Sequence, residues 1–165
     1  MYVYLIYILN IFIVALPWAL FEIIIEKDSG WGSRWPKNKW YAKKFAPENS
    51  LVRFIVQLLK IESPLNYHAL VFAAVLPVIF LFEYFFWTRN VMLLLASFIG
   101  VIVFEDFFWF LFNWNFDSLK QLLKGPGGSI WWHKGWTKIR RNYYLPSSYF
   151  SVLSLSIILL LLARL

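Results

Sequence analysis

Four long apolar runs constrain the fold of this chain more than any other feature. They cover about residues 2–25, 65–87, 91–114 and 145–163, and each approaches the length of about 20 residues that an α-helix needs to cross a bilayer. Hydrophobic residues make up 61% of the sequence and charged residues only 15%, which excludes an ordinary soluble domain. The runs predict an all-α integral membrane bundle of four transmembrane helices, in a single domain over residues 1–165.

Basic residues are concentrated in two of the connecting segments. Residues 27–64 hold eight Lys and Arg and residues 116–144 hold six, whereas the turn between the second and third runs has only Arg89. By the positive-inside rule, both basic segments are cytoplasmic and both termini face outward from the cell membrane. Such a basic face attracts anionic headgroups, so membrane lipids are expected partners. Nucleic acid is not expected, because no nucleic-acid motif accompanies the charge.

A shorter amphipathic segment lies in the first basic connection. Within residues 50–62, Arg53, Gln57 and Lys60 share one stripe of a helix, and apolar side chains fill the rest. The segment is too short to span a bilayer and too apolar for a solvated loop. We predict an interfacial amphipathic helix on the cytoplasmic side, with Ser50 as its N-cap.

An acidic pair, Glu105 and Asp106, lies deep within the third apolar run. Carboxylates at such depth are costly and usually mark a functional site or a buried pairing. On a helical wheel, Ala96 and Gly100 form a small-residue face suited to close helix packing. Trp109 points the opposite way, with one carboxylate on each side of it. We therefore expect the acidic pair to face a cavity or a polar neighbour, away from the tight helix contact.

The two carboxylates are expected to have different partners, because adjacent helix residues do not face each other. Asn113 lies on nearly the same stripe as Asp106, so these residues and Trp109 form one polar and aromatic face. On this argument Asp106 is assigned to a pocket and Glu105 to a structural pair.

Depth in the membrane selects the other groups that can meet near the acidic pair, which lies about 4 Å to the cytoplasmic side of the run's midpoint. The residues expected to line a cytoplasm-facing pocket are Glu22, Glu26, His68, Glu105, Asp106, Trp109, Asn113 and His133. Those expected to meet an anionic headgroup are Lys134, Arg140 and Arg141.

A divalent metal is the candidate cofactor of such a pocket, because carboxylates and imidazoles bind these ions. Its candidate ligands are Asp106, Glu105, Glu22 and His133. The chain contains no cysteine, so thiolate ligands, thiolate nucleophiles and disulfides are excluded.

Each of these residues also has a structural interpretation. The acidic pair can simply pair with a neighbouring helix, and Glu22, Glu26 and His68 can be solvated at the membrane boundary. The three tryptophans of the second basic connection are expected to form an interfacial aromatic belt rather than a stacking surface for a substrate; they are Trp131, Trp132 and Trp136.

Three classes of function remain open on these grounds. The preferred one is a small membrane protein whose pocket binds a cation, or an anionic amphiphile or lipid, at the intramembrane carboxylates. The second is an accessory or structural subunit of a larger complex, in contact with partner membrane subunits or with further copies of itself. The third is a membrane enzyme acting on a lipid, although no recognised catalytic motif is present.

Three segments of the sequence carry a resemblance. They are residues 21–36 (FEIIIEKDSGWGSRWP), 105–116 (EDFFWFLFNWNF) and 131–136 (WWHKGW). These segments are similar to patterns in small uncharacterised prokaryotic membrane proteins. The resemblance implies a multi-span membrane protein, and it implies no activity and no catalytic roles.

Overall fold

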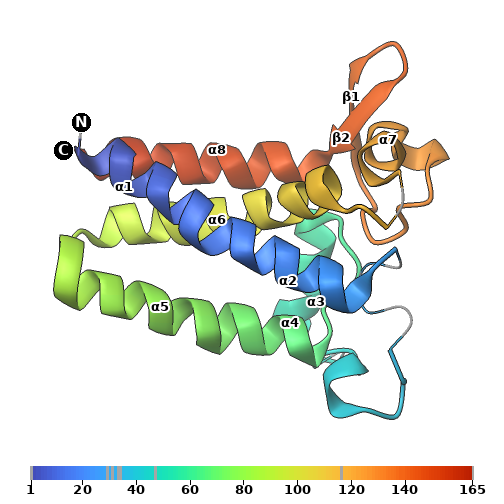
Figure 1. The fold of residues 1–165 in the computed structure, drawn as a ribbon, viewed down its shortest axis with the longest axis horizontal. Coiled ribbons are helices and arrows are strands. Elements are labelled where there is room, and N and C mark those ends of the chain that lie inside the picture. Colours follow the sequence, from blue (N-terminus) through green and yellow to red (C-terminus); the bar gives the residue numbers. More distant parts are fainter. Residues whose placement is uncertain are drawn as a thin grey trace.

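The structure, a computed structural model, is mainly helical, with 69% helix and 8% strand. It describes residues 2–28, 30, 32, 35–46, 48–115 and 117–164. Long apolar helices lie side by side as a bundle, and a small two-stranded hairpin projects from one end (Figure 1). The prediction of a helical membrane bundle is confirmed at this level, while the hairpin is an element that the all-α prediction lacked.

The first long helix is continuous from Tyr2 to Glu26. It consists of α1 (Tyr2–Asn10), the π-helical turn η1 (Ile11–Ala15) and α2 (Leu16–Glu26). The π turn ends just before Pro17. A proline removes one backbone donor and crowds the carbonyl four residues earlier, and a local widening of the helix relieves that crowding without ending the helix.

The second long helix repeats this arrangement and is continuous from Asn66 to Thr88. Its parts are α4 (Asn66–Leu70), the π turn η3 (Val71–Val75), α5 (Leu76–Glu83) and the π turn η4 (Tyr84–Thr88). The turn η3 again ends just before a proline, Pro77. Both helices therefore keep their length across an internal proline.

The third and fourth long helices are α6 (Val91–Phe112) and α8 (Ser147–Leu162). In the described part of the chain, three helices are long and apolar enough to cross a membrane, namely Tyr2–Glu26, Asn66–Thr88 and Val91–Phe112. Helix α8 has 16 residues, or about 24 Å of helix. It begins later than the predicted residue 145 because the preceding residues belong to a β-strand.

The connecting segments gather at one end of the bundle, and the two termini lie at the other end beside the tight turn before α6 (Figure 1). At the turn, the side chain of Asn90 accepts a hydrogen bond from the backbone N–H of Leu93 at 2.9 Å and donates to the carbonyl of Ala163 at 2.8 Å. The C-terminal end of α8 is thereby tied to the start of α6. The two basic connections consequently share one end, as the alternation of charge along the chain requires.

Close packing of α6 against α1 and α8 centres on the small-residue face. A Cβ at Gly100 would lie 2.6 Å from the Tyr7 hydroxyl oxygen. That hydroxyl is 2.9 Å from the Ser156 Oγ atom, which donates to the Ala96 carbonyl at 2.7 Å. The predicted tight contact at Ala96 and Gly100 is confirmed, and α8 supplies part of it.

The first basic connection contains a 3₁₀ turn, η2 (Trp40–Ala42), and the amphipathic helix α3 (Ser50–Leu59). The helix is shorter than the predicted residues 50–62. Its N-cap is Asn49 rather than Ser50, since the Asn49 side chain accepts from the N–H groups of Leu51 and Val52. No residue of α3 is buried, so its apolar face is open, with Leu51 and Leu58 each more than 60% exposed.

The second basic connection contains α7 (Ser118–Leu123), the 3₁₀ turn η5 (Gly125–Gly127) and an antiparallel hairpin. The hairpin strands are β1 (Trp136–Arg140) and β2 (Tyr143–Pro146), in which Trp136 pairs with Pro146. The pairing continues directly into α8, so the hairpin fixes where the last helix begins.

Candidate functional site

A cavity of about 120 Å³ lies in the half of the bundle nearest to the connecting segments. Residues from α2, the second long helix, α6 and α8 form its walls, and residues from both basic connections close its end. The lining residues are Glu22, Glu26, Leu59, Ile61, His68, Phe72, Ile102, Val103, Glu105, Asp106, Trp109, Trp132, His133, Ser148, Tyr149 and Val152. The structure thus brings together seven of the eight residues expected in the pocket.

Asn113, the eighth residue, lies outside the cavity. It ends α6, and its side chain donates to the Lys27 carbonyl at 2.6 Å and accepts from the backbone N–H of Asn115 at 3.0 Å. Asn113 therefore ties the end of α6 to the chain that follows α2. Asp106 on the same stripe lines the cavity, but α6 ends at Phe112 and the backbone of Asn113 is extended, so the stripe does not continue to Asn113.

Asp106 has two partners from distant parts of the chain. Its Oδ2 atom accepts from the Nε2 atom of His133 at 3.1 Å and from the hydroxyl of Tyr149. An ionised carboxylate can only accept, so Nε2 of His133 is the donor in this bond. Asp106 lines the cavity, as the helical wheel predicted, and it is also firmly paired with residues of two other segments.

Glu105 is the member of the pair that faces the cavity with unused hydrogen-bonding capacity. Its side chain is 6% exposed, and within the described chain its Oε1 atom has no hydrogen-bond partner. Its carboxyl group lies against that of Glu22. Two negative charges side by side in an apolar cavity are costly unless a cation or a proton accompanies them.

The two acidic residues of α2 lie at successive turns of the helix and are both buried. Glu22 accepts from the indole N–H of Trp18 at 3.1 Å. Glu26 accepts from the backbone N–H of Gly32 at 2.7 Å. The interpretation of these residues as solvated groups at the membrane boundary is wrong, because both are buried in the bundle.

The two histidines of the cavity come from different segments of the chain. His68, 4% exposed, begins the second long helix and accepts from the Leu65 N–H at its Nδ1 atom, 3.2 Å away. His133 comes from the second basic connection and is 7% exposed. In the described part of the chain, the Nδ1 atom of His133 has no hydrogen-bond partner.

A short strap of chain closes the end of the cavity. Residues 60–62 pair with residues 132–134 through two backbone hydrogen bonds, from Glu62 N to Trp132 O at 2.7 Å and from Lys134 N to Lys60 O at 2.6 Å. The Glu62 carboxylate is 2.9 Å from the ammonium groups of both Lys44 and Lys134. These two cations, Lys44 first, hold the pKa of Glu62 at about 2, below its ordinary value of 4.5.

Tryptophans form part of the cavity wall. Trp132 is 4% exposed and stacks on Phe110, with ring centroids 5.8 Å apart and planes 12° from parallel. The Trp109 ring meets Trp132 edge to face at 5.7 Å. Trp132 is therefore a core residue, and the expectation of an interfacial belt is wrong for it, whereas Trp131 is 44% exposed.

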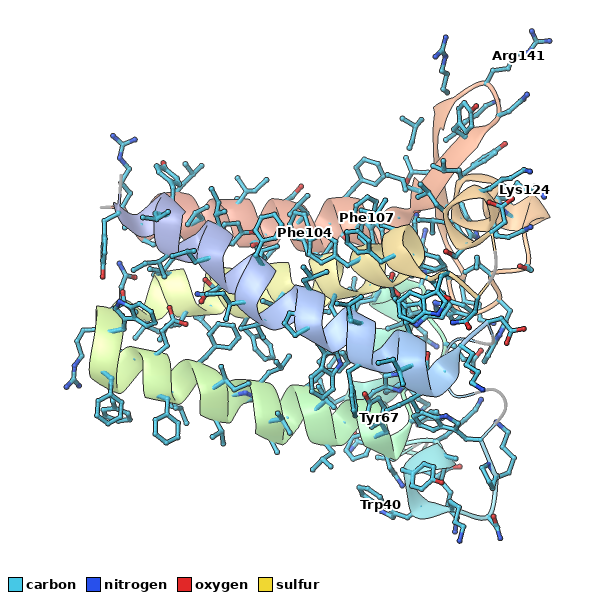
Figure 2. The ribbon with its side chains drawn as sticks, viewed as in Figure 1. Trp40, Tyr67, Phe104, Phe107, Lys124 and Arg141 are labelled. Carbon is cyan, nitrogen blue, oxygen red and sulfur yellow. The ribbon has the colours of Figure 1, made fainter. Side chains whose placement is uncertain are left out.

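The basic residues assigned to a headgroup do not line this cavity. Lys134 is engaged by Glu62 in the strap. Arg140 ends β1 and Arg141 follows it at the exposed tip of the hairpin, pointing away from the bundle (Figure 2). None of the lining residues, all of which lie in the described chain, is Lys or Arg. The cavity is acidic, and the basic surface is separate from it.

Several lining residues had no counterpart in the predicted site. The main ones are Tyr149 and Ser148, at the start of α8, and Trp132. Depth was the available signal for Tyr149, since it lies near the end of the last apolar run that joins the second basic connection. Nothing in the periodicity of that run indicates which side chain of another helix it would meet.

The described side chains of the cavity are not arranged as a metal site. Among the described residues, no three His, Asp or Glu side chains are placed so that they could hold one ion. The proposed ligands Glu22, Glu105, Asp106 and His133 share the cavity, but their partners are distributed among Trp18, Tyr149 and each other. An organic cation, which needs fewer direct oxygen ligands than a metal ion, fits this arrangement better.

Comparison with protein-family models, with curated proteins and with solved structures finds no match to this chain. The fold and the cavity therefore define only a class, a helical membrane bundle with an acidic cavity among its helices. What this cavity does has to be argued from its own residues.

Proposed function

We propose that the chain is a four-span membrane protein whose acidic cavity binds an organic cation with an apolar body. The observation that carries this proposal is the combination of four carboxyl groups, no Lys or Arg, and a mainly apolar wall around one cavity. In this arrangement α8 is the fourth span, both termini face outward, and the cavity lies toward the cytoplasmic side. Helix α3 rests on the cytoplasmic interface with its exposed apolar face in the lipid.

A cation is favoured over an anionic headgroup by the charges around the cavity. An anion placed there would meet Glu22, Glu26, Glu105 and Asp106 without a basic side chain to compensate. In a low-dielectric site such like-charge contacts are costly, and the same groups would attract a cation strongly. We therefore do not propose an anionic amphiphile or lipid as the ligand of this cavity.

An organic cation is favoured over a small inorganic ion by the walls. Trp109, Trp132 and Tyr149 present aromatic rings, and Phe72, Ile102 and Val152 present aromatic and aliphatic surface. Aromatic faces attract ammonium groups, and apolar surface binds the hydrocarbon part of the same molecule. An alkylammonium amphiphile entering from the membrane matches both features.

Anionic lipids are proposed as partners of the outer basic surface instead. Lys138, Arg140 and Arg141 are exposed on the hairpin at the end that carries the basic connections. Basic residues at a membrane surface are each worth about 1 kcal/mol toward an anionic leaflet. The hairpin would thus hold this end of the protein to the headgroups while the cavity remains acidic.

Calorimetric titration of octylammonium into the purified full chain in maltoside micelles tests the proposal. Saturable binding of about one ion per chain is expected above the signal of protein-free micelles, and 1-octanol, which lacks the charge, is expected not to compete. Glu105→Gln should weaken binding about tenfold or more, because a charge in a low-dielectric site is lost.

Glu83→Gln is the matched control for this experiment. Glu83 is also an intramembrane carboxylate, but it accepts from Asn10 at 3.0 Å and lies in a different region, outside the acidic cavity. Binding should be unchanged in this variant. An unchanged affinity in Glu105→Gln, or an equal loss in Glu83→Gln, would show that octylammonium does not use the cavity.

A further inference from the structure

Two buried acceptor atoms of the cavity have no partner in the described chain. They are Oε1 of Glu105 and Nδ1 of His133, and both side chains line the cavity while being more than nine-tenths buried. A buried polar atom without a hydrogen bond destabilises the fold. Such atoms are usually satisfied by water or by a ligand.

The bond from His133 to Asp106 determines what Nδ1 can do. Nε2 faces the Asp106 carboxylate as the donor, so in the neutral form of the ring the second nitrogen carries a lone pair. The hydroxyl of Tyr149 donates to the same Asp106 oxygen, which keeps that carboxylate engaged. In the neutral form of the ring Nδ1 of His133 presents an acceptor, and Glu105 Oε1 presents a second one.

We infer that the cavity is selective for primary ammonium ions, whose N–H groups supply the donors that Glu105 Oε1 and His133 Nδ1 lack. This inference rests on the proposed function and names the class of cation that the site takes. A purely aromatic and apolar site favours quaternary ammonium ions, since these cost less to dehydrate. Buried acceptors reverse the preference, because a quaternary ion has no N–H group and leaves them unsatisfied.

A comparison of two probes with the same chain length tests the inference. Octylammonium and octyltrimethylammonium are titrated into the purified full chain in the same micelles, each corrected for protein-free micelles. Octylammonium is expected to bind at least about tenfold tighter, the factor that corresponds to about 1.4 kcal/mol.

His133→Gln isolates the acceptor. Its amide can reach the Nε2 position and still donate to Asp106, but it leaves nothing at the Nδ1 position. The preference for the primary ion should fall severalfold in this variant, mainly through weaker binding of octylammonium. If His133→Gln does not give a monodisperse protein, the comparison of the two ions on the unmodified chain still decides the inference.

The outcomes separate the two proposals. Binding of both ions with equal affinity would overturn the selectivity and leave the cation site standing. Tighter binding of the trimethyl ion would also overturn it. Failure of either ion to bind above the micelle background would overturn the proposed function, and the selectivity with it.

Discussion

His133 and Tyr149 meet at one atom, since both donate a hydrogen bond to Oδ2 of Asp106. One donor comes from a loop between α7 and β1 and the other from the first turn of α8. Asp106 therefore links α6 to both the second basic connection and α8.

Replacement of Asp106 by Leu should destabilise the bundle, because it leaves two buried donors without an acceptor. A loss of about 2–4 kcal/mol is expected from bonds to a charged group, read as a fall in the melting temperature by tryptophan fluorescence in detergent. Asp106→Asn keeps an oxygen and should cost less. Tyr149→Phe should cost about 1 kcal/mol in the unmodified chain and almost nothing in the Asp106→Leu background, where its bond is already lost. Additive losses would contradict the shared acceptor.

Gly100→Ala should destabilise the packing of α6 against α1. The added Cβ would lie 2.6 Å from the Tyr7 hydroxyl oxygen and 3.1 Å from the Ile11 Cδ1 atom, so one helix has to move. Overpacking of this kind costs about 1–3 kcal/mol, measured as a lower melting temperature. Gly127→Ala is the matched control, because a Cβ there meets no atom within 4 Å, and the melting temperature should not change. Equal effects of the two substitutions would contradict close packing at Gly100.

The long helices and their small-residue contact were predictable because both depend on local pattern. Hydropathy fixes the apolar runs to within a few residues, and the spacing of Ala96 and Gly100 fixes one face of α6. Depth along each run likewise indicated that Glu22, Glu26 and His68 could reach the acidic pair. These arguments need only helix geometry and the thickness of a bilayer.

The partners within the site were not predictable from the same patterns. Which carboxylate is paired depends on where His133 folds back, and that position is set by the pairing of residues 60–62 with residues 132–134. In α8, Tyr149 and Ser156 bond to residues of α6 and α1, and the pattern of the helix itself does not indicate these contacts. Trp132 is buried because it belongs to the segment of the second basic connection that pairs with residues 60–62.

Asn49→Ala should loosen α3 without affecting the bundle. The Asn49 side chain accepts from two backbone N–H groups of the first turn, and the loss of an N-cap costs about 1 kcal/mol. Since no residue of α3 is buried, global unfolding should be unchanged. Faster amide hydrogen exchange confined to residues 51–59 is the expected result in lipid nanodiscs. Ser50→Ala is the control and should leave exchange unaltered; a larger effect at Ser50 would assign the cap to that residue.

Acidification should open the strap through Glu62. The pKa of Glu62 is about 2 in the folded chain because of Lys44 and Lys134, against an ordinary value of 4.5. A group whose pKa is lowered by folding stabilises the fold above its unfolded value, and that contribution is lost as the pH falls toward the folded value. Both lysines are more than half exposed, so solvent and salt reduce the effect to about 1 kcal/mol.

The stability difference between the unmodified chain and Glu62→Gln should therefore be constant from neutral pH down to about pH 5 and should disappear between about pH 4.5 and pH 2. Melting temperatures of both proteins across this range provide the measurement, repeated at high salt, where the difference should shrink. Lys134→Met should reproduce part of the loss at neutral pH, because it leaves only Lys44 beside the carboxylate. A difference that persists unchanged at pH 2 would mean that the ionised Glu62 does not hold the strap, leaving its closure to the two backbone hydrogen bonds.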